Sequence, residues 1–136
     1  MEINKLPNFS DKRGDLIPLE FSLLPFFPRR LFIVKNVKKG IKRGEHAHHK
    51  TRQFLVCVKG EVKVVTHNGV AFNETTIKEG QTTLIEPYHW DWQEFLTGDD
   101  ILLVVCSTPY NETDYIFNFD LFLKITKELK DDRYQP

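Results

Sequence analysis

Short apolar segments separated by turn residues are the feature of this sequence that most limits its fold. Residues 54–58 and 101–106 are wholly apolar, which is typical of buried strands. Asn68-Gly69 favours a tight hairpin, and Pro25 and Pro28 exclude a helix between them. The pattern predicts an all-β fold of about eight to ten strands at roughly 8 to 12 residue spacing, as in jelly rolls. Strands are expected at residues 15–20, 30–36, 53–58, 61–66, 70–77, 82–86, 90–96 and 101–106, and through His46 and His48.

Only the carboxy-terminal segment has a helical pattern. Its recurring residues are spaced by three or four positions, as on one face of an α-helix. They are Phe119, Phe122, Leu123, Thr126 and Leu129. Asn118 or Asp120 is the expected cap, and the helix is expected to pack on the outside of the barrel.

The composition indicates one soluble domain over residues 1–136. The 19 acidic and 19 basic side chains cancel, so the chain lacks the basic character that nucleic-acid binding requires. No apolar run is long enough to span a membrane, and the amino terminus does not read as a signal peptide. We therefore expect a cytoplasmic protein. Cys57 and Cys106 lie in apolar runs, so they are expected to be inert core thiols.

Two histidines form the strongest candidate site. His46 and His48 are two residues apart in a segment followed by an apolar run, so a strand places both imidazoles on one face. Their backbone positions are then roughly 6 to 7 Å apart, which is close enough to share one cavity. Spaced around the pair are Gly40, Gln53 and Gly60. This spacing resembles the first motif of the cupin superfamily, which implies a double-stranded β-helix, or jelly-roll barrel.

The metal ligands of that superfamily are incomplete here. Gln53 stands where metal-binding cupins carry a glutamate, and an amide oxygen is a poorer ligand than a carboxylate. The second cupin motif is recognisable from Gly80 to Trp92, but His89 and Trp92 occupy its glycine and histidine positions. These are too few strong donors for zinc or iron. The sequence predicts neither a metal nor another cofactor.

A narrower resemblance covers most of the chain. The sequence is similar to the WxcM-like sugar 3,4-ketoisomerases in residues 11–20, 43–50, 53–60 and 109–116, of which the last segment, PYNETDYI, is the most specific. The resemblance implies a metal-free cupin that isomerises a dTDP-linked 4-keto-6-deoxyhexose to the 3-keto sugar. It further implies a role in making 3-amino-3,6-dideoxyhexoses of surface glycans, and a homodimer that exchanges amino-terminal strands. The chain departs from the family at Phe32-Ile33, where tyrosines are usual, and at Asp91, where histidine or arginine is usual.

The residues can be assigned roles in that reaction. Moving a keto group from C4 to C3 needs a base for the C3 proton and an acid for C4, and imidazoles do both near neutral pH. We assign His48 as the base and His46 as the relay, although the spacing alone does not fix which is which. Arg43 is a candidate for the diphosphate or the enediolate oxygen, or else belongs to a solvated basic loop.

Several other residues have expected positions. Gln53, His89 and Trp90 complete the substrate-binding candidates, with Trp90 either a stacking wall for thymine or sugar, or plain core. His49 and His67 are expected in solvent. Tyr110 and Tyr115 are expected to fix the carboxy-terminal crossing on the barrel. The apolar residues 21–27 predict an exposed face that a dimer would cover.

Two other functions remain open. A related cupin enzyme, such as a 3,5-epimerase, uses the same barrel and acid-base chemistry. A sugar- or nucleotide-binding cupin without activity is favoured if Phe32-Ile33 removes an essential hydroxyl. The sequence does not determine whether the product is galacto or gluco at C4, and it gives the nucleotide only through the resemblance.

Overall fold

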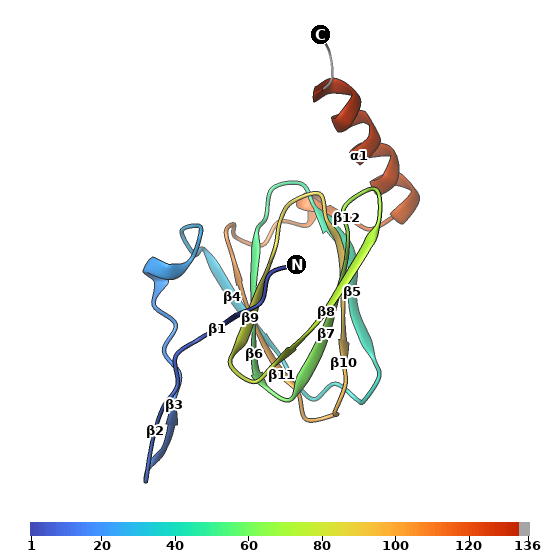
Figure 1. The fold of residues 1–136 in the computed structure, drawn as a ribbon. Helices are drawn as coiled ribbons and strands as arrows, with labels where there is room; N and C mark the ends of the chain where they lie inside the picture. The colour runs from blue at the N-terminus through green and yellow to red at the C-terminus, as the bar shows by residue number, and fades with distance from the viewer. Residues whose placement is uncertain (134–136) are drawn as a thin grey trace.

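Two five-stranded sheets face each other and form a barrel in the computed structural model, which describes residues 1–133 (Figure 1). The first sheet has the order β1 (Asn4–Lys5), β9 (Gln81–Ile85), β6 (Gln53–Lys59), β11 (Ile101–Cys106) and β4 (Arg30–Val34). The second has the order β12 (Tyr115–Ile116), β5 (Lys42–His48), β10 (Trp90–Phe95), β7 (Glu61–His67) and β8 (Phe72–Lys78). From β4 to β12 the chain passes repeatedly between the two sheets. The expected jelly-roll barrel is confirmed.

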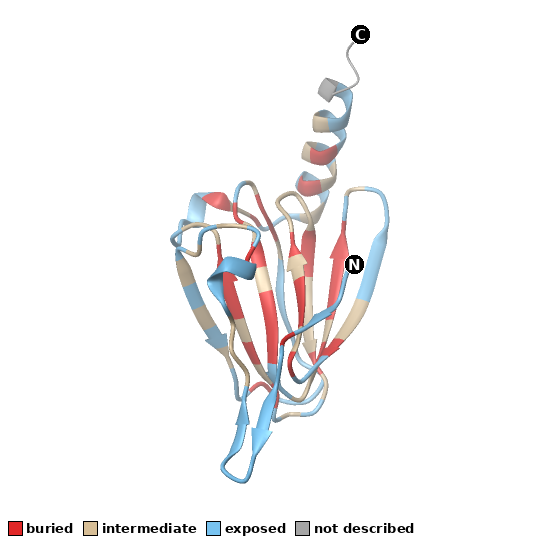
Figure 2. Ribbon diagram, turned by 60° about the vertical axis from the view of Figure 1, so that its left-hand side comes forward, coloured by how far each residue is buried: buried red, intermediate tan, exposed pale blue. Residues whose placement is uncertain are grey.

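Strand alternation fills the interior of the barrel. Inward residues of β6, β7 and β11 form the core, and some outward residues between them, such as Phe54, Lys63 and Leu103, are only half-buried. Figure 2 shows the long buried stretches of the barrel strands. The buried core residues are Val37, Leu55, Cys57, Val62, Val64, Ile77, Ile85, Phe95, Leu102, Val104 and Cys106. Both thiols are free, and burial raises the pKa of Cys57 to about 12 and that of Cys106 to about 11. They are core residues, as expected.

The amino-terminal segment leaves the barrel. β2 (Phe9–Asp11) and β3 (Gly14–Leu16) form a hairpin whose residues are all exposed and which projects from the body of the molecule (Figure 1). The strand expected over residues 15–20 is wrong beyond Leu16. Pro18 has no backbone N–H for a ladder, and a short 3-10 helix, η1 (Phe21–Leu23), follows.

The helix α1 (Phe119–Arg133) is capped by Asn118, whose Oδ1 accepts a hydrogen bond from the Leu121 N–H at 2.9 Å. Its first turns pack on the barrel through the buried Phe122 and Thr126, and the rest extends away from it (Figure 1). The expected packing on the outside therefore holds for these turns. No helix in the described part of the chain is long and apolar enough to cross a membrane.

His67 belongs to this helix contact. Its ring lies edge-on to Phe119 and Phe122 at centroid distances of 5.2 and 6.1 Å, and its side chain is buried. The expectation that His67 lies in solvent is wrong, because the first turns of α1 cover the end of β7, where the residue lies.

Candidate active site

A bulge in β5 positions the two histidines. The pairing with β10 shifts where Gly44, at φ 109°, and Glu45, at φ 63°, adopt left-handed backbone conformations. A side chain at Gly44 would lie 3.0 Å from the Asp91 carbonyl oxygen, so glycine is required there. After the bulge, His46 lies opposite Asp91. The buried Ala47 points the other way, which leaves both histidines on the inner face, as the sequence predicts.

A buried carboxylate orients His48. The His48 Nδ1–H donates to Asp114 Oδ2 at 2.9 Å, and a carboxylate can only accept. The other ring nitrogen, Nε2, is therefore the basic one. Asp114 also accepts from the hydroxyl of Thr51 and, at 2.8 Å, from the N–H of Lys50. Burial opposes the charge on Asp114, but these hydrogen bonds outweigh it and lower its pKa. His48 and Asp114 form a histidine–carboxylate pair of the kind that supports acid-base catalysis.

Both imidazoles are neutral near pH 7. The pKa of His48 is lowered by burial, an effect that Asp114 opposes and Arg30 reinforces. Burial and the neighbouring His48 lower the pKa of His46 to about 4. The two rings meet edge to face with centroids 5.0 Å apart. A neutral pair is suited to take a proton from a carbon acid and return it.

Tyr115 completes the wall around the pair. Its ring centroid lies 4.3 Å from that of His48 and 5.0 Å from that of His46, and its ring stacks on Phe117. From the sequence, Tyr115 is expected only to fix the carboxy-terminal crossing on the barrel, and Asp114 has no predicted role. The only local signal for either was the family-specific segment PYNETDYI that contains them.

Arg30 is the cation whose positive charge lowers the pKa of His48. The sequence did not predict Arg30 as a site residue. Its guanidinium lies over the rings of Phe32 and Tyr110, at 4.8 and 5.0 Å from their centroids. Strand alternation could have suggested it, because Arg30 shares the inner face of β4 with Phe32. Arg43, by contrast, is exposed on β5 opposite Gln93.

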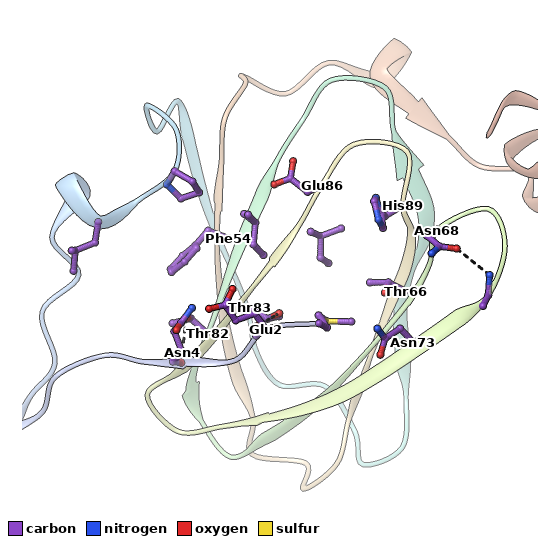
Figure 3. A pocket seen from close by; sticks show the side chains of 16 residues that line it. Glu2, Asn4, Phe54, Thr66, Asn68, Asn73, Thr82, Thr83, Glu86 and His89 are labelled. Atoms are coloured by element: carbon purple, nitrogen blue, oxygen red, sulfur yellow. Dashed lines mark hydrogen bonds between the residues drawn. The ribbon is translucent and has the colours of Figure 1, made fainter. Parts of the chain in front are cut away.

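A cavity of about 470 Å³ opens beside the amino-terminal segment. His89 lines it together with Thr66, Asn73 and Thr83 (Figure 3), and the His89 Nδ1–H donates to the Pro87 carbonyl at 3.0 Å. Neither His46 nor His48 lines this cavity. The strand register nevertheless connects the cavity with the histidine pair, since directly paired inner-face residues of neighbouring strands lie in one row across the sheet. The row runs through Asn73, Thr66, Asp91 and His46.

Gln53 and Trp90 have different surroundings. Gln53 shares the inner face of β6 with core residues, and its buried Nε2 has no hydrogen-bond partner in the described residues. Trp90 lies on the outer face of β10, 6% exposed, against Phe119 and Phe122 of α1. A ligand could stack on Trp90 only if the helix moved. Within residues 1–133, no three His, Cys, Asp or Glu side chains are grouped so that they could hold a metal ion.

Known proteins that resemble this chain in sequence and in fold include sugar-nucleotide isomerases. A curated TDP-4-oxo-6-deoxy-alpha-D-glucose-3,4-oxoisomerase of Aneurinibacillus thermoaerophilus is 34% identical over an alignment of 126 residues, and the match covers 89% of this chain and 91% of the relative. The 3,4-ketoisomerase QdtA of Thermoanaerobacterium thermosaccharolyticum, solved with TDP, is 31% identical with a TM-score of 0.87. That match covers 98% of this chain and 96% of QdtA.

A second structure of QdtA carries a histidine-to-asparagine substitution and holds TDP-4-keto-6-deoxyglucose. It is 31% identical to this chain, with a TM-score of 0.86, over 93% of this chain and 94% of that one. The family model "FdtA: WxcM-like, C-terminal" matches residues 1–127. The expected membership is therefore confirmed, and the chain belongs to the FdtA family of WxcM-like, C-terminal proteins.

Proposed function

We propose that the protein converts a TDP-linked 4-keto-6-deoxyhexose to the 3-keto isomer by histidine acid-base chemistry, without a metal. The observation that carries the proposal is the His48–Asp114 pair on the inner face of the barrel, next to His46. The names of the related oxoisomerase and of QdtA support the substrate class. The product would serve the synthesis of 3-amino-3,6-dideoxyhexoses of surface glycans.

In this reaction His48 acts as the base. The C4 carbonyl acidifies the C3 proton, and Nε2 of His48 takes it while Asp114 stabilises the imidazolium that forms. His46 relays the proton to C4. Arg30 supplies a fixed positive charge on the His48 side, where negative charge develops on the enediolate.

Three other residues, His89, Gln53 and Arg43, are assigned to substrate binding. His89 lines the cavity and is a contact for the nucleotide sugar, and Gln53 has an unpartnered amide N–H that a sugar oxygen can accept from. Arg43 is assigned to the diphosphate because it is an exposed cation at the start of the histidine strand. The donor set supports chemistry without a metal, since Gln53 offers an amide where a carboxylate ligand would be needed.

We also propose a homodimer in which amino-terminal strands are exchanged. The β2–β3 hairpin exposes Phe9 by 64% and Leu16 by 62%, and a second copy would cover them. Light scattering should then give twice the mass of 16.0 kDa. A monomer at micromolar concentration contradicts this part of the proposal. A cytoplasmic location stays an expectation from the sequence.

The function is tested by incubating the protein with TDP-4-keto-6-deoxyglucose and assigning the product by NMR. We expect a 3-keto sugar, and His48→Asn should lower turnover by roughly 10² to 10⁴. His49→Asn is the matched control, because this neighbouring ring contacts Tyr88 instead. Deuterium exchange at C3 should be lost in His48→Asn and retained in His46→Asn. An unchanged substrate, or full turnover in His48→Asn, contradicts the assignment.

A further inference from the structure

Two carboxyl groups in the described part of the chain are almost completely buried, and their surroundings differ. Asp91 and Asp100 are each 1% exposed. Asp100 accepts hydrogen bonds from the N–H groups of Glu61, Thr97 and Gly98 and from the Thr97 hydroxyl. These bonds outweigh burial and lower its pKa. Asp100 is thus a structural carboxylate whose charge is fully satisfied.

The carboxyl group of Asp91, in contrast, accepts a single hydrogen bond within residues 1–133. Its Oδ1 accepts from Gln93 Nε2 at 2.7 Å, and its Oδ2 has no hydrogen-bond partner among residues 1–133. An unpaired buried charge costs far more than a buried neutral acid, so this environment favours the protonated form. Burial accordingly raises the pKa of Asp91 to about 7, against the smaller opposing effect of Gln93.

The strand register places Asp91 next to the proposed active site. It lies directly opposite His46 on one side and opposite Thr66, which lines the cavity, on the other. Cβ atoms of directly opposite residues are roughly 4.5 to 5.5 Å apart. Within the row, Thr66 and Asn73 do not ionise, and His46 is the titratable neighbour. Asp91 therefore stands between the cavity wall and the histidine pair.

We propose that Asp91 is a third acid-base group of this site, which passes a proton between the two oxygens of the sugar that change places as carbonyl and hydroxyl. The inference rests on the proposed ketoisomerase function. It assigns a task that the histidines leave undone, because moving the carbon-bound hydrogen from C3 to C4 also requires a proton to move from O3 to O4. The unpartnered Oδ2 is the atom that would meet the substrate oxygen.

His48 takes the proton of the C3–H bond, the electrons of that bond form the C3–C4 double bond, and the C4 oxygen takes the proton of Asp91. The products of this half are a neutral enediol, a His48 imidazolium and an Asp91 carboxylate. The carboxylate then takes the proton from the C3 hydroxyl, the C3 carbonyl forms, and C4 takes the proton that the histidine pair removed. Asp91 and the histidines end in their starting states.

Asp91→Asn tests this assignment, because asparagine keeps the shape and a hydrogen-bond donor but has no proton to transfer. We expect formation of the 3-keto sugar to fall by roughly 10² to 10⁴. Deuterium exchange at C3 should stay within about tenfold of wild type, because the asparagine N–H can still stabilise the C4 oxygen by a hydrogen bond when His48 removes the C3 proton. The ratio of exchange to turnover should therefore rise. A merely structural role would lower both rates together. Such a parallel loss, or wild-type turnover, overturns the proposal.

A second measurement does not depend on turnover. Infrared difference spectra at pH 6 should show the carbonyl band of a protonated carboxyl group in the wild type, absent from Asp91→Asn. Folded Asp100→Asn is the matched control and should retain the band. A missing band in an active wild type overturns the role of Asp91 alone. A wild type that neither exchanges nor isomerises the sugar overturns the proposed function, and the Asp91 assignment with it.

Discussion

Replacing Asp114 by asparagine should separate the orientation of His48 from the stability of the barrel. Asp114 accepts from His48, Thr51 and Lys50, so an amide in its place puts an NH₂ group against at least one donor. If the amide oxygen stays with Lys50, the NH₂ group faces His48 and favours the tautomer whose basic nitrogen is Nδ1. The nitrogen that faces the substrate then carries the proton and cannot act as the base.

These contacts set the size of the loss in stability and of the loss in turnover. Loss of one strong or two weaker hydrogen bonds to a charged group, at about 1.5 to 3 kcal/mol each, lowers the free energy of unfolding by about 3 kcal/mol. For a chain of 136 residues this corresponds to a decrease in Tm of about 10 °C. Turnover should fall by roughly 10² to 10⁴, because a misprotonated imidazole removes the general base.

Asp100→Asn provides the matched comparison. Asp100 is also a buried carboxylate with four hydrogen bonds, but it lies beside Gly60, at the other end of β6 from Gln53. We expect a similar loss of Tm and unchanged turnover, with unfolding followed by calorimetry and product formation by NMR. Wild-type turnover in folded Asp114→Asn, or an equal loss of turnover in Asp100→Asn, would refute the reasoning.

Three further outcomes follow from the same geometry. Burial lowers the pKa of His48, so the acid limb of the pH profile of kcat/KM should lie below pH 6.5. Arg30→Gln removes a positive charge and should therefore move this limb to higher pH. A shift of the limb to lower pH contradicts this. The raised pKa of Asp91 means that the neutral carboxyl contributes its full stability below about pH 3.9 and loses it as pH rises through about 7. Urea unfolding should therefore show the stability of Asp91→Asn rising relative to that of the wild type between about pH 4 and 7, and a constant difference over this range counts against protonation. Gly44→Ala should lose about 1 to 3 kcal/mol and most of the turnover because the bulge positions His46, whereas Gly80→Ala, with open space around it, should only lose stability.

The sequence alone determined the fold class and the histidine pair. Turn residues and short apolar segments limit the chain to short strands, and the two-residue period of a strand places His46 and His48 on one face wherever the strand lies. Both features are local, so they can be read without knowing what packs against them. The narrower family resemblance likewise depends on residues that are contiguous in the chain.

Only the tertiary structure decided which partners those histidines have. Asp114 is 66 residues from His48, and no pattern near either residue indicates their hydrogen bond. Trp90 and His67 are covered because the first turns of α1 dock over them, which a strand pattern cannot reveal. Alternation separates the two faces of a strand, but closure of the barrel and docking of the helix decide what each face meets. The state of Asp91 is fixed in the same way, because a carboxyl is kept neutral by its surroundings and not by its neighbours in sequence.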